Sequence, residues 1–421
     1  MGTPVAAAAA VAVDGGDLAL GGGLLALLRP ALDRLEPGGV LAVLSSTRSV
    51  LDDLASWCRV ERHEYLGTEE IAAGRQRHLI RRGSLGVPRG ERERGGTLVA
   101  HDGRITASDL IASVPFPATA DPATGFAPRG ARVEPGGPAY PFTLDRADRV
   151  APPEVAALYD QAIGAQWDAS RDIPWQDVKP LPPGLDAAVG QIMTFLAENE
   201  LSALYVPSRF IARIHPAYVE TAMFLATQLN DEARHIDVFL KRARLGGEQS
   251  GPGVSSAVTA HSLHSLLVLE DFTEVAFLLS VLGEGTFLDL LRFIERHAPD
   301  AATAEIARRA RIDETRHVHF GIDHVKHALA THPTLYARLE DAVRRRAATL
   351  SGAGSVPAPV IDALTVLAAG GLEPSKISAG HEAVQELMAE MHASRLKRLT
   401  HAGFTAAQAE MISSLHTPNF M

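Results

Sequence analysis

The sequence predicts a mainly helical protein: a four-helix bundle with extra C-terminal helices, preceded by a small α/β domain. Three observations indicate this class. Residues 151–421 carry the apolar spacing of amphipathic helices almost throughout, with turn residues confined to short gaps. Residues 14–84 alternate helix-like and β-branched stretches, as α/β domains do. Between them, residues 85–150 are rich in Gly, Pro and Arg, so we expect a linker or lid there.

The composition narrows the class of protein. The chain has 421 residues, 46% of them hydrophobic, and a net charge of −10, which permits a sizeable core and argues against nucleic acid as a partner. The single cysteine, Cys58, excludes an intramolecular disulfide and a cysteine-rich metal site. No uncharged apolar run reaches the roughly 18 residues of a membrane span. The Ala-rich start lacks the basic region of a signal peptide, so we expect a cytoplasmic protein without membrane contact.

Within residues 14–84 we expect a helix, a strand, a second helix and two further strands. The helical stretches read "LLALLRPALDRL" and "VLDDLASWC", and the strand-like ones "VLAVLSST", "VERHEYLG" and "RQRHLIRRG". Across "LEPGGVLAVLSSTRSVLDDLASWCRVERHEYLG" and "RHLIRRG" the region resembles the TusA-like sulfur-carrier family, whose Cys-Pro-x-Pro motif would fall at Leu20–Gly23. The chain reads "LGGG" there, and Cys58 lies elsewhere in the fold. Because the thiolate is the nucleophile, the resemblance implies a degenerate domain without sulfur-carrier chemistry.

A pentapeptide occurs twice in the helical part, as "DEARH" at Asp231–His235 and "DETRH" at Asp313–His317. Glu-x-x-His places a carboxylate and an imidazole on one helix face, so both can point at one metal ion. On the order of one Glu-x-x-His pair is expected by chance in a chain this rich in Glu and His. A repeat of the whole five-residue string is not expected by chance. The sequence therefore predicts four metal ligands: Glu232, His235, Glu314 and His317.

The residues that flank these ligands also suit a metal site. A metal-bound His normally donates its other ring nitrogen to a carboxylate, and Asp231 and Asp313 can each serve the His of the opposite helix. Arg234 and Arg316 then balance the charge of the acids.

A di-metal carboxylate bundle needs one further acid from each of the two remaining helices. Such an acid should lie on an apolar helix face, where an unpaired charge is costly. On the first helix Glu200 lies on that face, whereas Glu198 points elsewhere. On the third helix Glu284 lies on it, but Glu270 and Glu274 share the same face.

Hairpin geometry tests these choices, since ligands at one height on two antiparallel helices are equidistant from the turn. Glu200 and Glu232 have their midpoint at Pro216, within "IHPAY". Proline suits a turn between helices. The first hairpin therefore pairs these two acids.

The second hairpin separates the candidates on the third helix. Glu284 and Glu314 have their midpoint at Pro299, within "HAPDA". Pairing Glu274 with Glu314 instead places the turn at Ile294, inside a helical run. We therefore favour Glu284, with the other two acids left as alternatives or pocket residues.

Hard carboxylates with one imidazole per metal suit iron or manganese better than zinc, so we expect two Fe ions or a mixed Fe/Mn pair. Residues 155–335 resemble the ferritin-like, carboxylate-bridged di-iron superfamily. It includes the ribonucleotide reductase small subunit, acyl-carrier-protein desaturases, multicomponent monooxygenases and aminobenzoate N-oxygenases. The likeness lies in "ENELSALYVP", in the two strings "DEARH" and "DETRHVHFG", and in "GEGTF".

Some positions depart from individual members of this superfamily. The reductase subunit carries a radical tyrosine four residues after its first ligand His, and here Phe239 occupies that position; the second His is followed at that distance by Gly321. The N-oxygenases place a third His where this chain has Ala310. We therefore expect neither tyrosyl-radical storage nor that three-histidine ligand set.

The resemblance implies a non-haem di-iron oxygenase or oxidase. O2 would be activated between Glu232 and Glu314, the catalytic pair, to hydroxylate, desaturate or N-oxygenate a small organic substrate, free or carrier-bound. A separate ferredoxin or reductase would supply electrons, and a homodimer is compatible with the helical tail. The alternatives are a ferroxidase or storage protein and a metal-stabilised scaffold without redox chemistry. An apolar cavity beside the metals would favour the oxygenase, and a polar iron channel would favour storage.

Overall fold

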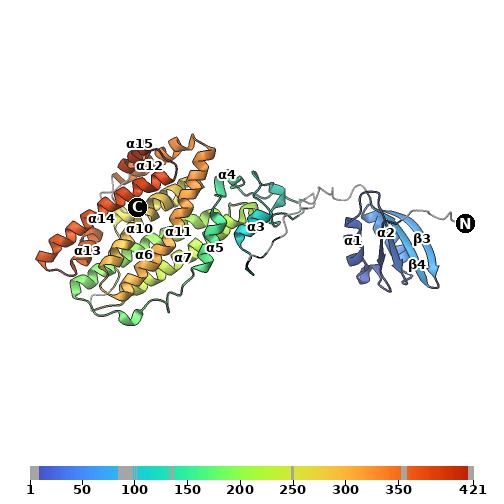
Figure 1. Ribbon diagram of the computed structural model, residues 1–421, viewed down its shortest axis with the longest axis horizontal. Coiled ribbons are helices and arrows are strands. Elements are labelled where there is room, and N and C mark those ends of the chain that lie inside the picture. The colour runs from blue at the N-terminus through green and yellow to red at the C-terminus, as the bar shows by residue number, and fades with distance from the viewer. Residues whose placement is uncertain are drawn as a thin grey trace. The chain divides into compact units, whose positions relative to one another are not determined.

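The computed structural model describes residues 9–83, 98, 100, 102–131, 133, 137–247, 251–351 and 358–415. The chain divides into two compact units, Met1–Glu93 and Arg94–Met421 (Figure 1). Helices make up most of the second unit, and a four-stranded sheet lies in the first. The mainly helical class predicted from the sequence is confirmed.

The N-terminal unit packs two helices on a mixed sheet. Its elements are β1 (Val11–Asp14), η1 (Leu20–Gly22), α1 (Leu24–Asp33), β2 (Val40–Ser45), α2 (Val50–Val60), β3 (Glu64–Ala72) and β4 (Arg75–Arg81). The strand order is β1-β2-β4-β3, with β1 parallel to β2 and the other neighbours antiparallel. The apolar faces of α1 and α2 bury Leu28 and Leu54 in one core with Leu41 of β2. Strand β1 begins before residue 14, where the predicted α/β domain starts, and was not predicted.

Cys58 lies in this core and is fully buried on α2. Burial raises the pKa of its thiol to about 12, so the reactive thiolate does not form at neutral pH. The position where the TusA-like family would carry its cysteine is the turn η1, which leads through Gly23 into α1. The resemblance of this unit to that family stays a prediction.

The described part of the segment 85–150, which we expected to be a linker or lid, contains α3 (Ala107–Ser113), η2 (Pro122–Thr124) and α4 (Ala147–Val150). It packs against the helical unit. The Tyr218 hydroxyl donates to the carbonyl oxygens of Pro117 and Asp145, at 3.1 and 2.9 Å. Arg129 forms a buried ion pair with Glu220. These contacts fix the described part of the segment on the bundle, and residues 84–97 lie outside the described residues.

Four long helical elements form the bundle that positions the site. They are α6 (Pro183–Ile211), α7 (Val219–Arg244), the pair η5 (Ala276–Glu284) and α10 (Gly285–His297), and α11 (Ala301–Thr331). α6 lies along α7, and η5 and α10 lie along α11 (Figure 1). Their apolar faces share one continuous hydrophobic core.

Both predicted hairpin turns are confirmed. α6 is joined to α7 through η4 (Pro216–Tyr218), which begins at the proline expected at the midpoint. α10 ends at His297 and α11 begins at Ala301, so Pro299 lies in the second turn. The Asp300 side chain caps α11 by accepting the backbone N–H of Thr303, which explains where this helix starts.

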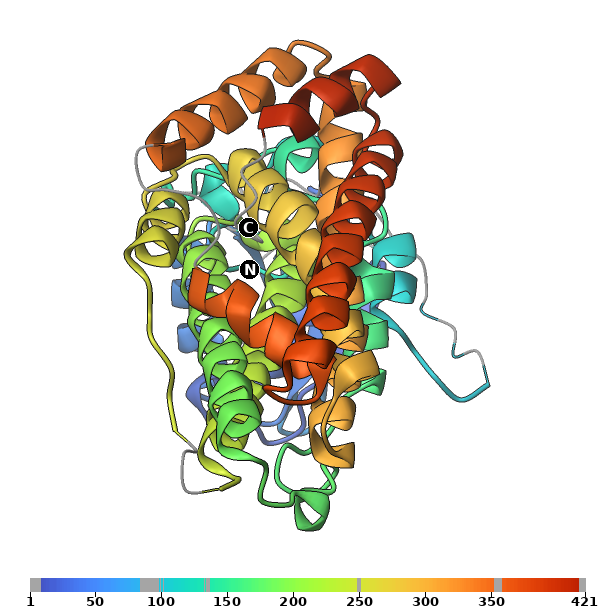
Figure 2. The same ribbon diagram turned by 90° about the vertical axis from the view of Figure 1, so that its left-hand side faces the viewer.

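Further helices surround the bundle: α5 (Val155–Gly164), η3 (Trp175–Asp177), α8 (Ala257–Leu267), α9 (Phe272–Val275), α12 (Leu335–Ser351), α13 (Ala358–Ala369), α14 (Pro374–His401) and α15 (Ala406–Leu415). α13 packs on α6, and α14 packs on α10 and α11. Figure 2 shows α14, in red, running along the flank of the bundle. Among the helices the structure describes, none combines the length and apolar character that crossing a membrane requires.

The element η5 is a π-helix of nine residues, "AFLLSVLGE". In a π-helix each backbone carbonyl accepts a hydrogen bond from the N–H five residues later. Such helices occur mostly as short segments within α-helices, often at functional sites. The adjoining face of α11 carries Gly321, where an added Cβ would lie 2.6 Å from the Cβ of Ser280. This close approach holds η5 against α11 and brings Glu284, its last residue, to the centre of the bundle.

Candidate metal centre

The structure brings all six predicted ligands together in the middle of the bundle. They come from the four bundle elements, and each is at most 6% exposed: Glu200 on α6, Glu232 and His235 on α7, Glu284 at the end of η5, and Glu314 and His317 on α11. Two groups can be formed in which the ligand atoms lie within 4.8 Å of one another. Glu200 and His235 belong to one group, Glu284 and His317 to the other. Glu232 and Glu314 belong to both, the position of bridging carboxylates.

The imidazoles aim the same atom, Nδ1, into the cluster. His235 Nδ1 lies 3.3 Å from Glu314 Oε1, 3.4 Å from Glu232 Oε2 and 3.7 Å from Glu200 Oε1. His317 Nδ1 lies 3.1 Å from Glu232 Oε1 and 3.3 Å from Glu314 Oε2. In both Glu232 and Glu314, therefore, one carboxylate oxygen faces His235 and the other faces His317.

Several polar atoms of this cluster are buried without a hydrogen-bond partner among the described residues: Glu200 Oε1, both carboxylate oxygens of Glu232, His235 Nδ1, Glu284 Oε2 and Glu314 Oε1. A buried polar group without a partner is costly, and a buried charge without one is more so. Two divalent cations would neutralise four glutamates and give every one of these atoms a ligand bond. The donor set therefore fits two metal ions with oxygen-rich coordination.

The pKa values show how the cluster responds to its own charge. Burial raises the pKa of Glu200, with the carboxylates of Glu232 and Glu314 adding to the effect. Burial also raises the pKa of Glu284, and the nearby carboxylate of Glu314 adds to this effect. Burial alone would raise the pKa of Glu232 too, but the imidazoles of His317 and His235 outweigh it and lower it.

The imidazoles shift in the complementary direction. Burial alone would lower the pKa of each imidazole, because it opposes the charged form. The surrounding carboxylates outweigh burial and raise both pKa values. Asp313 has the largest raising effect on His235, and Glu314 on His317. Without a metal the cluster therefore retains protons. Metal binding must displace them, which makes affinity depend on pH.

The two aspartates of the repeated pentapeptide serve the His of the opposite helix. His235 Nε2 lies 3.2 Å from Asp313 Oδ2, and His317 Nε2 lies 3.3 Å from Asp231 Oδ2. A carboxylate at Nε2 holds the proton on that nitrogen and leaves the Nδ1 lone pair directed at the cluster. The tautomer that a metal requires is thus set by this crossed arrangement.

Two arginines neutralise these aspartates. Arg234 Nη2 contacts both Asp231 and Asp313, the latter at 3.2 Å. Arg316 Nη2 contacts the same two acids, 3.1 Å from Asp231. Hydrogen bonds and charge from His235, Trp167 and Arg316 outweigh burial and lower the pKa of Asp313. The two acids and two arginines form a largely buried network next to the predicted metal ligands.

Three residues of the site were missed by the sequence reasoning. Trp167 Nε1 donates to Asp313 Oδ2 at 2.7 Å, and Gln166 Nε2 lies 3.4 Å from Asp231 Oδ1. Both come from the segment after α5, which no local pattern connects with α11. Gln228 Nε2 donates to Glu284 Oε1 at 3.1 Å. It lies one helical turn before Glu232, and its position on the same face was the available signal.

The alternative third-helix acids lie elsewhere. Glu270 is 75% exposed in its side chain and pairs with Arg209 and Arg213. Glu274 pairs with Arg338 and Arg345. Neither belongs to a group able to bind a metal among the residues the structure describes. The geometry places Glu284 at the cluster instead.

A small cavity borders the cluster on the side of α6 and η5. It has a volume of about 10 Å³ and touches Glu200, Glu284 and Glu314. Its remaining lining is mainly apolar: Ala203, Leu279 and Phe287, with Asn199 and Ser202. A space of this size holds about one water-sized molecule. A molecule larger than water enters this space only if a lining side chain such as Leu279 or Phe287 moves.

Comparison with known proteins gives a distant likeness only. The sequence matches no protein-family model and no curated protein. Among solved structures, a variant of an R2-like ligand-binding oxidase with an aerobically reconstituted Mn/Fe cofactor is 17% identical and aligns over 58% of this chain and 92% of its own, with a TM-score of 0.45. An R2-like ligand-binding oxidase with the same kind of cofactor is 16% identical over 63% and 93%, with a TM-score of 0.42. At these values the likeness assigns neither a family nor an activity to this chain.

Proposed function

We propose that this protein is a non-haem di-metal oxidase or oxygenase that uses O2 to oxidise a small organic substrate. The observation that carries the proposal is the set of buried ligand atoms without hydrogen-bond partners among the described residues, contributed by four bundle elements and pointed at one place. A scaffold without metal would have to bear the cost of four buried carboxylates around two imidazoles, an arrangement that replacement by apolar residues would relieve.

The metal ions would be two Fe, or one Fe and one Mn, and when bound they would supply the redox electrons that O2 activation needs. Glu232 and Glu314, the proposed catalytic pair, would hold both ions, because each belongs to both candidate groups. Asp231 and Asp313 keep His317 and His235 in the tautomer that presents Nδ1.

The protein also controls what reaches the centre. The cavity next to Glu200 and Glu284 is lined mainly by Ala203, Leu279 and Phe287, and it is closed to a molecule larger than about one water. An apolar wall favours an apolar part of a substrate over hydrated iron ions. We propose that the substrate enters when Phe287 or Leu279 changes rotamer, and that hydroxylation, desaturation or N-oxygenation follows from which bond is then nearest the centre.

The remaining partners are part of the same proposal. Electrons for repeated turnover would come from a ferredoxin or reductase, and the protein would act in the cytoplasm, without nucleic acid or membrane, as a monomer or homodimer. The N-terminal unit would be a degenerate TusA-like module that recognises a carrier-bound or sulfur-containing substrate without carrying sulfur itself, in keeping with its buried Cys58.

A second function, ferroxidase activity, is favoured by one observation. The cavity of about 10 Å³ holds no sizeable organic molecule unless side chains move. A ferroxidase needs no organic substrate, and the same six ligands would serve it.

The experiment loads the protein with Fe(II), or with Fe(II) and Mn(II), under anaerobic conditions, adds O2, and follows O2 consumption and the optical spectrum. An oxidase or oxygenase consumes O2 once per centre and stops until a reductant is supplied. A ferroxidase continues to consume O2 as long as excess Fe(II) is present.

Two variants serve as controls for this experiment. Glu232→Gln should lose the reaction, and Glu270→Gln, which changes an exposed acid away from the cluster, should keep it. Absence of any O2 consumption by the loaded wild-type protein would refute both functions.

A further inference from the structure

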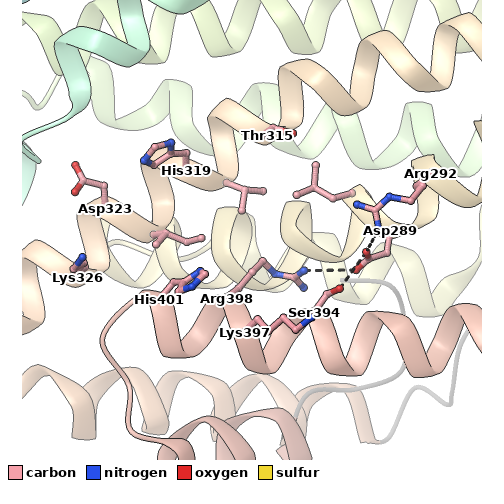
Figure 3. Close-up of a pocket in the computed structure, with 13 residues that line it drawn as sticks. Asp289, Arg292, Thr315, His319, Asp323, Lys326, Ser394, Lys397, Arg398 and His401 are labelled. Atoms are coloured by element: carbon pink, nitrogen blue, oxygen red, sulfur yellow. Dashed lines mark hydrogen bonds and ion pairs between the residues drawn. The ribbon is translucent and has the colours of Figure 1, made fainter.

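A second cavity lies between α10, α11 and α14, and none of its lining residues is one of the six predicted metal ligands (Figure 3). Its volume is about 560 Å³, within the range of ligand-binding pockets. The side chains around it are strongly cationic: Arg292, Lys326, Lys397 and Arg398, together with His319 and His401.

The positive charge of the cavity is only partly neutralised by its own walls. Four cations face two acids, Asp289 and Asp323, in a chain whose net charge is −10. Asp323 already accepts the backbone N–H of Glu154, at 3.0 Å. Over the described ranges, Lys326 and Lys397 form no ion pair. Cations gathered in a concave site raise the local concentration of anions.

Arg398 lines this cavity, and only 9% of its side chain is exposed. Its Nε donates to the Val281 carbonyl at 3.3 Å, and its Nη1 is 3.6 Å from Asp289 Oδ2. Its Nη2 has no hydrogen-bond partner among the residues described. Burial lowers the pKa of this guanidinium to about 10, which still leaves it charged at neutral pH. A buried guanidinium with an unused donor is a costly arrangement that an anion would relieve.

Asp289 is not a full partner for this arginine. Its Oδ1 accepts hydrogen bonds from Arg292 and Ser394, both at 3.2 Å, while Oδ2 has no hydrogen-bond partner within the described part of the chain. In Figure 3 the guanidinium of Arg398 extends toward Asp289, beside Lys397 and Ser394. The acid lies beside the guanidinium but leaves its buried Nη2 donor without a partner among the described residues.

Part of the cavity wall is apolar, because Leu288, Val318 and Ile322 also line it. A ligand that fits must therefore carry an anionic group and an apolar body. Arginine presents a planar fork of donors that matches phosphate, and lysine pairs with phosphate as a point charge. We propose that this cavity binds a phosphate ester with an apolar substituent, whose phosphate lies on Arg398 and Lys397, while Lys326 adds positive charge at another part of the cavity wall.

Such a phosphate ester has two sources: a free small molecule, or a phosphate-linked arm presented by another protein. Isothermal titration calorimetry with hexyl phosphate, inorganic phosphate and hexanol, on metal-free and metal-loaded protein, tests the first source. Hexyl phosphate should bind at least about tenfold more tightly than inorganic phosphate, by burying its alkyl chain. Its affinity should fall as salt is added, and hexanol should not bind. Competition between hexyl phosphate and a 4′-phosphopantetheine-bearing carrier protein tests the second.

The double variant Lys326→Ala/Lys397→Ala should weaken hexyl phosphate binding by at least about tenfold, since it removes the charge-assisted contact of Lys397 and the positive charge that Lys326 adds to the cavity. Both lysines are exposed, so the fold should survive. The matched control is Lys376→Ala, an exposed lysine at the other end of α14 that pairs with Glu373, and it should bind as the wild type does. Equal binding by the double variant, or binding of hexanol as tight as that of hexyl phosphate, would overturn the proposal. So would no binding of any of these probes or of the carrier protein.

Discussion

Replacing single glutamates of the cluster by glutamine should remove metal-linked stability in a graded way. Glu200 belongs to one metal group and Glu284 to the other, whereas Glu232 belongs to both. Glu200→Gln or Glu284→Gln should therefore weaken mainly one metal position, and Glu232→Gln should weaken both.

The magnitude follows from the number of sites. At a free metal concentration of about 100 Kd, one independent site adds about 2.7 kcal/mol to the free energy of unfolding, and two add about 5 kcal/mol. In a large domain about 1 kcal/mol raises Tm by roughly 2 °C, so the wild type should gain about 10 °C on loading. Glu200→Gln should retain about half of that gain, and Glu232→Gln little of it.

The same variants should behave differently without metal. Burial raises the pKa of Glu200 and of Glu284, so these acids already carry protons in the metal-free protein. An amide of the same shape replaces them with little change, and the metal-free Tm should move by no more than about 2 °C. A substitution that merely damaged packing would lower Tm in both states.

The assay is scanning calorimetry under anaerobic conditions, with and without Fe(II) or Mn(II), accompanied by metal analysis of the same samples. Glu270→Gln is the control, because its carboxylate pairs with Arg209 and Arg213 away from the cluster. The reasoning is refuted if Glu200→Gln and Glu284→Gln keep the full wild-type gain, or if Glu270→Gln loses as much as they do.

Three further predictions concern the surroundings of the centre. Asp313→Asn should lower metal affinity about 10- to 100-fold by releasing the tautomer of His235, measured by competition with a chelator; unchanged affinity would exclude that role. His324 is buried and its pKa is lowered to about 4, so the unfolded chain takes up a proton between pH 6.5 and 4 that the folded protein refuses. Stability should fall by roughly 3 kcal/mol as pH falls through that window, and His324→Gln should lack this loss in acid denaturation curves. Gly321→Ala should destabilise the protein by about 1–3 kcal/mol in urea, because its Cβ would lie 2.6 Å from the Cβ of Ser280, and a neutral effect would contradict the close packing of η5 on α11.

Much of the site could be predicted because it depends on the helical period. A repeated Glu-x-x-His string fixes two ligands on each of two helices, and an acid on an apolar face is exceptional enough to stand out at Glu200. Equidistance from a turn then selected Glu284 over Glu274, and the structure has turns at Pro216 and Pro299. These inferences use only local geometry.

Other features depend on contacts between distant segments and have no local signal. The bond from Trp167 to Asp313 joins parts of the chain that no repeat or spacing relates. The π-helical winding of η5 lies in an apolar run that an ordinary α-helix would accommodate equally well, so the sequence pattern does not reveal it. The cationic cavity is lined by Lys326 of α11 and Lys397 of α14, and no sequence pattern relates these two helices.

The most direct test of the account is anomalous diffraction from crystals of the protein loaded anaerobically with Fe(II) or Mn(II), recorded at the absorption edge of each metal. The account predicts two metal peaks per chain, one among Glu200, Glu232, His235 and Glu314 and one among Glu232, Glu284, Glu314 and His317. Metal peaks elsewhere, or none in the bundle at full loading, would contradict it.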